Sequence, residues 1–430
     1  MDSWHFCSRK SHRPSGRKCF GETISEFEND IMKSIKEIYK IGKGPSSSHT
    51  MGPQKAAAAY LEHHPDVRNF HVTLYGSLAA TGRGHLTDVA VMETLGRAGH
   101  VEIEWQPKIF LPRHPNGMAI AVAGENGERH DEWTFYSIGG GNIVCDQLPV
   151  DNSPEIYPLN SMTDLLNWCN TNSRNYWEYV QEHEDSDVWD YLATVWKAMC
   201  DSIERGLDKE GILPGPLRLR RKAASYYVRA EGYKDVLRTR GLIFAYALAV
   251  SEENASGGII VTAPTCGSCG VLPGVLYHLR NIYGYSDKRI IRSLATAALV
   301  GNVVKQNASI SGAEVGCQGE VGVACAMTAA AANQLMGGSP AQIEYSAEMG
   351  LEHHLGMTCD PVCGLVQIPC IERNAYAAAR ALDANIYASY TDGLHRVSFD
   401  QVVRAMKRTG KDLPSLYKET GEGGLAAVVE

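Results

Sequence analysis

Residues 320–334 read EVGVACAMTAAAANQ, and residues 295–304 read ATAALVGNVV. Both stretches consist mostly of alanine, glycine and other small residues. Small side chains let helix backbones approach closely, so both stretches predict central helices of a packed bundle. Other helical patterns follow Met162, with few strand signals, and predict a mostly α-helical second half. Helices are expected over 165–180, 188–205, 238–251, 287–304, 315–335, 341–350 and 371–382.

The first half of the chain has a different pattern. Apolar and polar residues alternate in several short runs, which predicts strands. These runs are NFHVTLYGSL (69–78), VEIEWQP (101–107), GMAIAVAG (117–124) and WTFYSIGGGNIV (133–144). Helices are predicted before the first strand, over 24–39 and 55–63, and after it, over 90–95.

Strands interleaved with helices indicate an α/β domain that ends near residue 150. The predicted fold class is therefore α+β. We expect an α/β domain over 32–155 and a mostly helical catalytic domain over 156–430. Residues 1–31 are basic and lack an apolar period, so we expect a disordered or non-native N-terminal extension there.

Composition narrows the class of protein. The 430 residues carry a net charge of -8, which argues against a nucleic-acid or anionic-membrane partner. No run of apolar residues approaches the roughly 18 to 20 that a membrane span needs. Twelve cysteines without a secretory signal argue against a disulfide framework and favour a cytoplasmic protein.

The cysteines are crowded into one part of the chain. Cys317, Cys359 and Cys370 each lie beside a turn breaker or cap residue, where a thiolate could approach a metal. Zinc sites usually contain CxxC pairs, which this spacing does not offer. Three thiolates from separate loops suit a [4Fe–4S] cluster with one open iron. The alternative is that all three are small buried core residues.

Two other stretches allow two interpretations each. GPSSSHTMGP (44–53) is either a flexible linker or a rigid cup for a small polar substrate. Cys266 and Cys269 have the spacing of a redox pair, but their surroundings favour a glycine-rich substrate loop.

Seven motifs together resemble those of the iron–sulfur L-serine dehydratases (L-serine ammonia-lyases), and the resemblance runs from about Ser34 to the C-terminus. It implies conversion of L-serine to pyruvate and ammonia with a [4Fe–4S] cluster and without pyridoxal phosphate. It also implies a homodimer, a beta-chain-like domain over 32–155 and an alpha-chain-like domain over 156–430. The motifs are GPSSSHTMGP (44–53), LYGSLAATGRGHLTD (74–88), SIGGGNI (137–143), EGILPGPL (210–217), ENASGGIIVTAPT (253–265), NASISGAEVGCQGEVG (307–322) and LEHHLGMTCDPVCGLVQIPCIERNA (351–375).

The resemblance assigns roles to individual residues. Cys317, Cys359 and Cys370 match the cluster ligands. His49 is the expected general base or proton relay, and His353 is the second candidate. The substrate is expected in a pocket between the domains. Its expected contacts are Ser46, Ser47, Ser48, Thr50, His85, Asp88, Lys305, Asn307 and Ser309, although helix capping would also explain several of these polar residues.

Three alternatives stay open at this point. The enzyme could act on a related hydroxy amino acid such as L-threonine, because one methyl group gives only about 1 to 3 kcal/mol of discrimination. The protein could be a serine-binding sensor without turnover, for example because Cys266, Cys269 and Cys363 perturb the cluster. It could also perform thiol redox chemistry through Cys266 and Cys269.

Overall fold

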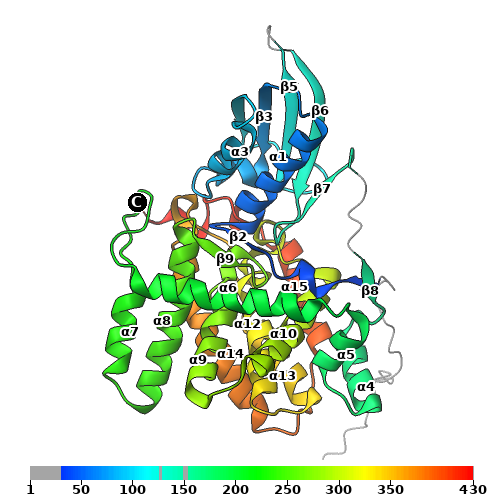
Figure 1. Cartoon of the computed structure of the whole chain (residues 1–430), viewed down its shortest axis with the longest axis vertical. Coiled ribbons are helices and arrows are strands. Elements are labelled where there is room, and N and C mark those ends of the chain that lie inside the picture. Colours follow the sequence, from blue (N-terminus) through cyan, green and yellow to red (C-terminus); the bar gives the residue numbers. More distant parts are fainter. Residues whose placement is uncertain (1–30, 125–127, 149–153, 430) are drawn as a thin grey trace, which may run out of the picture.

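The computed structural model describes residues 31–124, 128–148 and 154–429 (Figure 1). A small α/β part lies at one end of the long axis of the molecule, and a larger helical part fills the other end. The predicted α+β class is confirmed. Among the described residues, the structure contains no helix with the length and apolarity that crossing a bilayer requires.

The α/β part is built on a five-stranded sheet in the order β4-β3-β5-β6-β7. β3 and β4 are parallel, and the other neighbours are antiparallel. Helices α1 and α3 pack against each other beside the sheet, and a short helix, α2, follows β3. The bounds are α1 (Gly52–His63), β3 (Asn69–Tyr75), α2 (Gly76–Ala80), α3 (Thr87–Leu95), β4 (His100–Gln106), β5 (Gly117–Ala123), β6 (Arg129–Ser137) and β7 (Ile143–Cys145).

The helical part surrounds α12, which contacts α9, α10, α13 and α14. Every residue of α12 except Gln334 is buried. The bounds are α4 (Met162–Asn172), α5 (Tyr176–His183), α6 (Val188–Asp208), α7 (Ala223–Glu231), α8 (Asp235–Ala255), α9 (Val271–Tyr283), α10 (Asp287–Asn307), α11 (Gly312–Val315), α12 (Val321–Leu335), α13 (Pro340–Glu352), α14 (Cys370–Ser389) and α15 (Phe399–Asp412).

Small residues permit this packing, as the sequence predicts. A Cβ atom placed on Gly350 of α13 would lie 2.9 Å from Cα of Ala326 on α12. The backbones of α12 and α13 are therefore in contact at this point, and a residue larger than glycine at position 350 would force them apart.

The structure has two separate buried apolar clusters. The first contains residues between Ala56 and Cys145, and the second contains residues 32–39 together with residues from Tyr157 to Met406. The chain before the serine-rich loop packs with the helical part through two short antiparallel pairs. These pairs are β1 (Met32–Lys33) with β8 (Glu155–Tyr157), and β2 (Ile41–Lys43) with β9 (Ile259–Val261). The boundaries at 32–155 and 156–430 stay predictions.

The predicted helix over 24–39 is wrong where the structure describes it; residues 24–30 lie outside the described part. Met32 and Lys33 form β1, and Ile35–Glu37 is a single 3-10 turn capped by Ser34. Met32, Ile35, Ile38 and Tyr39 are all buried, so the apolar spacing was a correct sign of burial and a misleading sign of helix. Pairing with β8 supplies the backbone hydrogen bonds that a helix would have made.

Two other predicted helices are interrupted. The helix expected over 165–180 breaks at Ser173, which has a left-handed φ of 52°, and restarts with a capping box at Asn175. The helix expected over 315–335 contains Gly316 with φ of 74°, so the continuous helix α12 begins only at Val321. This second break places the 3-10 turn Gly316–Gln318 at the start of the central helix.

The contact between α6 and α8 yields a test of this packing. A Cβ atom placed on Gly206 would lie 2.2 Å from the carbonyl oxygen of Ala249, a backbone atom that cannot rotate away. We expect Gly206→Ala to lower the free energy of unfolding by about 2 kcal/mol or more, because overpacking outweighs the gain in helix propensity. Urea denaturation followed by circular dichroism measures this difference.

Gly232→Ala is the matched control. Gly232 is exposed with φ of -80°, and the nearest atom to an added Cβ is 3.3 Å away. Its free energy of unfolding should stay within about 0.5 kcal/mol of wild type. Equal losses in the two variants would contradict the close contact of α6 with α8.

Candidate active site

Two cysteines and a glutamate meet at the start of α12. Cys317 lies in the 3-10 turn after Gly316, Glu320 directly precedes α12, and Cys359 follows α13 in a loop. The Sγ atoms of Cys317 and Cys359 lie 3.8 and 3.9 Å from Oε2 of Glu320. The three ligating atoms are all within 4.8 Å of one another and buried, which is a spacing that a metal centre can use.

Cys370 is the first residue of α14 and belongs to the same surroundings. Its thiol is buried, and burial together with the nearby Cys317 raises its pKa well above the usual value. A hydrogen bond with Cys317 and burial raise the pKa of Cys359 in the same way. The structure therefore brings Cys317 and Cys359 together and places Cys370 near enough to be affected by Cys317. The thiols of Cys359 and Cys370 resist ionisation unless positive charge is supplied.

Arg373 is one cation beside this group. Its guanidinium lies 2.9 Å from Asp360 Oδ1 and donates to the carbonyl of Thr358. Burial opposes its charge, but Cys317 and Asp360 raise its pKa. Arg373 is thus already paired with a carboxylate, so it cannot balance three thiolates alone.

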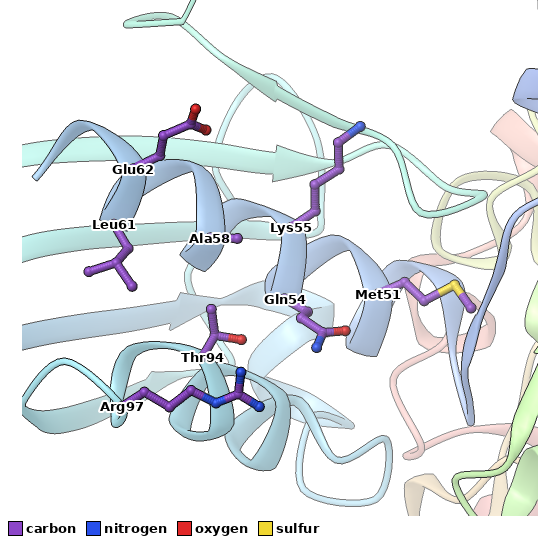
Figure 2. A pocket seen from close by; sticks show the side chains of 8 residues that line it. All are labelled: Met51, Gln54, Lys55, Ala58, Leu61, Glu62, Thr94 and Arg97. Atoms are coloured by element: carbon purple, nitrogen blue, oxygen red, sulfur yellow. The ribbon is translucent and has the colours of Figure 1, made fainter. Parts of the chain in front are cut away.

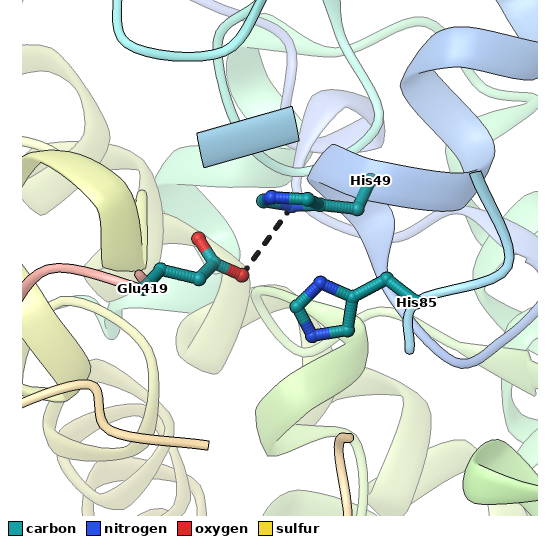
Figure 3. Close-up of side chains that lie close together, drawn as sticks. All are labelled: His49, His85 and Glu419. Atoms are coloured by element: carbon teal, nitrogen blue, oxygen red, sulfur yellow. Dashed lines mark ion pairs between the residues drawn. The ribbon is translucent and has the colours of Figure 1, made fainter. Parts of the chain in front are cut away.

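A second group contains His49, His85 and Glu419 (Figure 3). His49 lies in a single π-helical turn, Ser47–Met51, and is fully buried. Its Nδ1 lies 3.4 Å from Oε1 of Glu419, and its ring meets the ring of His85 edge-on at 4.5 Å between centroids. These three side chains come from the serine-rich loop, the glycine-rich loop after α2 and the segment after α15.

Hydrogen bonds determine the tautomer of His49. Nε2 lies 3.1 Å from the carbonyl oxygen of Ser77, which can only accept, so Nε2 carries the proton. Nδ1 lies 2.9 Å from Oγ of Ser48 and has the free lone pair. Burial lowers the pKa of His49 to about 3. At neutral pH this histidine is therefore an uncharged ring with an acceptor directed toward Ser48 and Glu419.

Glu419 connects the two groups. Its N–H donates to the carbonyl of Cys359, whose own N–H donates to Tyr417, so the C-terminal segment is paired with a ligand loop. Its carbonyl accepts a hydrogen bond from Oγ of Ser77, beside His49. Burial, Glu320 and Cys317 raise the pKa of its carboxyl group, and Oε2 has no hydrogen-bond partner among the described residues.

The stretch GPSSSHTMGP is a rigid turn, and the linker interpretation is wrong. Residues 44–50 are buried. Oγ of Ser46 accepts a hydrogen bond from the N–H of His49, and Oγ1 of Thr50 donates to the carbonyl of His85. The hydroxyl groups of Ser46 and Thr50 therefore help to hold His49 and His85 in place.

Several predicted substrate contacts have local partners. Asp88 accepts from the N–H of Val89 in the first turn of α3, Lys305 lies 3.7 Å from Glu37, Asn307 donates to the carbonyl of Asn160, and Oγ of Ser309 donates to Glu314. Their predicted role as substrate contacts stays a prediction, as it does for Ser46, Ser47, Ser48, Thr50 and His85.

The structure does not bring His353 to either group. Its side chain is exposed at the end of α13 and bonds the carbonyl of Met349. It lines a pocket of about 270 Å³ with Cys325 and Arg380, which includes none of the three predicted ligands.

Sequence analysis did not identify Glu320, Glu419 or Arg373. Glu320 follows Cys317 by three residues, a spacing that could have drawn attention to it. Glu419 had no comparable signal, because only tertiary pairing brings its segment to Cys359.

The surface also carries an open pocket of about 650 Å³ between α1 and α3 (Figure 2). Met51, at the end of the His49 turn, lies at one end of this pocket, and Lys55, Glu62 and Arg97 also line it. No thiol lines this pocket, so it is separate from the buried groups.

Comparison with known proteins gives consistent matches. The family model described as "Serine dehydratase alpha chain" matches residues 54–426. An L-serine dehydratase of Haemophilus influenzae is 40% identical, over 93% of this chain and 99% of that protein. L-serine dehydratase 1 of Escherichia coli is 40% identical, over 93% of this chain and 100% of that protein. The similarity therefore extends over both parts of the fold.

The buried His49 generates a pH prediction. Its folded-state pKa of about 3 lies below the ordinary value, so the unfolded chain binds a proton that the native state excludes. The stability that this histidine contributes is present above pH 6.5 and is lost as the pH falls toward 3. Between pH 7 and 5.5, we expect the free energy of unfolding to fall by about 1 kcal/mol less in His49→Gln than in wild type.

Urea denaturation at the two pH values measures this difference. His100→Gln is the control, because the His100 side chain is 71% exposed on β4. An unchanged pH slope in His49→Gln would show that His49 is not held neutral by burial.

Proposed function

Because the chain belongs to the serine dehydratase alpha chain family, we propose that it is an L-serine dehydratase that converts L-serine to pyruvate and ammonia. The observation that carries this proposal is the meeting of a buried thiol group with a buried neutral histidine, joined through Glu419. Dehydration of serine needs an electrophile at the β-hydroxyl and a base at the α-carbon.

We place the electrophile at Cys317, Cys359 and Cys370, which would hold a [4Fe–4S] cluster. The fit is supported by three buried thiols and by the buried carboxyl of Glu419, whose pKa is raised by burial, by Glu320 and by Cys317. When bound, a cluster with one open iron supplies a Lewis acid for the hydroxyl that leaves. Three cysteines leave a coordination position free for substrate, as a catalytic centre requires.

His49 is the proposed base. Its Nδ1 lone pair is available at neutral pH, and the hydrogen bond from Nε2 to Ser77 holds the ring in orientation. Removal of the α-proton places that proton on Nδ1, and Oε1 of Glu419 lies 3.4 Å from this atom. The product of dehydration is aminoacrylate, which tautomerises to an imine and hydrolyses to pyruvate and ammonia.

Serine is favoured over the alternatives. The relatives are named for L-serine and match this chain along nearly their whole lengths, which favours turnover of L-serine over a sensor role or a thiol redox role. L-Threonine should be a poorer substrate, by the roughly 1 to 3 kcal/mol that one methyl group can contribute. We further propose a cytoplasmic homodimer that uses no pyridoxal phosphate.

Iron binding tests the ligand assignment. After anaerobic reconstitution, we expect about four irons per chain and pyruvate production from L-serine. Cys317→Ala should lose both, because two cysteines cannot retain a cluster with an open position. Cys325→Ala is the matched control, since this cysteine is equally buried but lies within α12. Normal iron content and activity in Cys317→Ala would exclude Cys317 as a ligand.

Substitution of the base separates proton transfer from cluster binding. We expect His49→Gln to keep its iron and to lose about 10²- to 10⁴-fold in kcat, the usual contribution of general base catalysis. Pyruvate formation and exchange of the α-proton with deuterated solvent should fall together. The same measurements on His353→Gln decide between the two histidines, and loss of exchange only in that variant would transfer the role to His353.

A further inference from the structure

Buried polar atoms without partners gather around one turn of the α/β part. Most buried polar groups in native proteins are hydrogen-bonded, so a local concentration of unpaired ones indicates a place for a ligand. Five such atoms lie on residues that flank the turn Gly139–Gly141, pack against it or are linked by hydrogen bonds to its flanking strand. They are Nε2 of His114, Oδ1 of Asn116, Oγ of Ser137, Oδ1 of Asn142 and Oγ of Ser311.

The turn itself presents backbone donors. Gly139, Gly140 and Gly141 have φ values of +92°, +59° and +80°, a run of left-handed conformations that only glycine adopts readily. The turn is closed by hydrogen bonds from the N–H of Ile138 and of Asn142. Within the described residues, the N–H groups of the three glycines have no partner, and successive N–H groups of this kind form an anion-binding concavity.

The turn faces the buried thiol group across Ser311. A Cβ atom placed on Gly139 would lie 3.3 Å from Cβ of Ser311. The next residue, Gly312, is in contact with the thiol group, since a Cβ there would lie 3.2 Å from Sγ of Cys359. On its other side, the turn approaches the His49 loop, because a Cβ on Gly141 would lie 3.5 Å from Cβ of Met51. Ser311 is only 2% exposed, and its hydroxyl group has no hydrogen-bond partner among the described residues.

His114 adds a side-chain donor. Its Nδ1 accepts a hydrogen bond from the N–H of Asn116, so Nε2 carries the proton. This Nε2 is buried and lies 3.5 Å from Oε1 of Glu314, and among the described residues it has no closer polar partner. Burial opposes the charge of Glu314, but the contact with His114, the hydrogen bond from Ser309 and the charge of Lys418 together lower its pKa, so its negative charge is partly compensated.

We propose that the turn Gly139–Gly141, Oγ of Ser311 and Nε2 of His114 form the subsite for the substrate carboxylate. This proposal rests on the proposed function and specifies how its substrate is oriented. The backbone N–H groups of the turn, the hydroxyl of Ser311 and the Nε2–H of His114 are donors, which match an anion. A carboxylate held here lies between the His49 loop and Cys359, which directs the rest of a small amino acid toward both groups.

The test compares two ligands that differ only in the charge of this group. 3-Hydroxypropionate keeps the carboxylate and the β-hydroxyl of serine but lacks its α-amino group, and 3-hydroxypropionamide replaces that carboxylate by a neutral amide. Calorimetry on the reconstituted protein should show that wild type prefers the acid. Ser311→Ala should weaken binding of the acid roughly tenfold to a hundredfold and leave binding of the amide nearly unchanged.

Two further variants strengthen the test. Ser202→Ala removes another buried hydroxyl, which bonds the carbonyl of Met199 in α6, and should keep the full preference for the acid. Gly140→Ala adds a Cβ 3.2 Å from Cδ1 of Ile310, and should reduce the preference by distorting the turn. Melting temperatures of all variants exclude unfolding as the cause.

The outcomes separate this proposal from the proposed function. If wild type forms pyruvate but Ser311→Ala and Gly140→Ala keep the preference for the acid, the subsite is overturned and the function stands. If wild type forms no pyruvate from L-serine but both variants lose the preference, the carboxylate subsite stands and the proposed function fails.

Discussion

The site depends on the burial of several acidic side chains at one point. Cys317, Cys359 and Glu320 lie within 4.8 Å of one another, and Glu419 is close enough to perturb them. Arg373 is already paired with Asp360. Burying such groups in their charged forms without balancing charge is costly, and this cost is why we propose a metal centre among them. The helix ends and loops of this region are shaped to bring these groups together.

The site is completed by parts of the chain that belong to different apolar clusters. The α/β part supplies the loops with His49, His85 and the glycine turn, while the helical part supplies the thiols and Ser311. The segment around Glu419 holds the two together, because its backbone pairs with Cys359 and also accepts from Ser77. Small-molecule sites are common between such parts, where water can be excluded once the substrate is bound.

Local sequence patterns predicted most elements of the fold. Strands such as 69–75 and helices such as 321–335 lie near their predicted places. Burial of one face of a strand produces an alternating apolar pattern, and burial of a helix on all sides produces a continuous run of small apolar residues. The segment 32–39 shows where such patterns fail to predict the conformation. Its apolar residues are buried as predicted, but pairing with β8 and the cap at Ser34 decide its conformation. Apolar spacing indicates burial, but the backbone partner of Met32 is Tyr157, far along the chain, and no local pattern identifies it.

Residue types and motifs by themselves determined the chemistry of this protein: which cysteines to compare, which histidine lies in a hydroxyl-rich loop, and which family the chain resembles. Only the tertiary structure decided which of these groups meet. It joined Glu320 and Glu419 to the thiols, left His353 exposed, and surrounded the turn Gly139–Gly141 with unpaired polar atoms. The physical reason is that desolvation and hydrogen-bond pairing depend on the whole surroundings of a side chain, which residues distant in sequence supply.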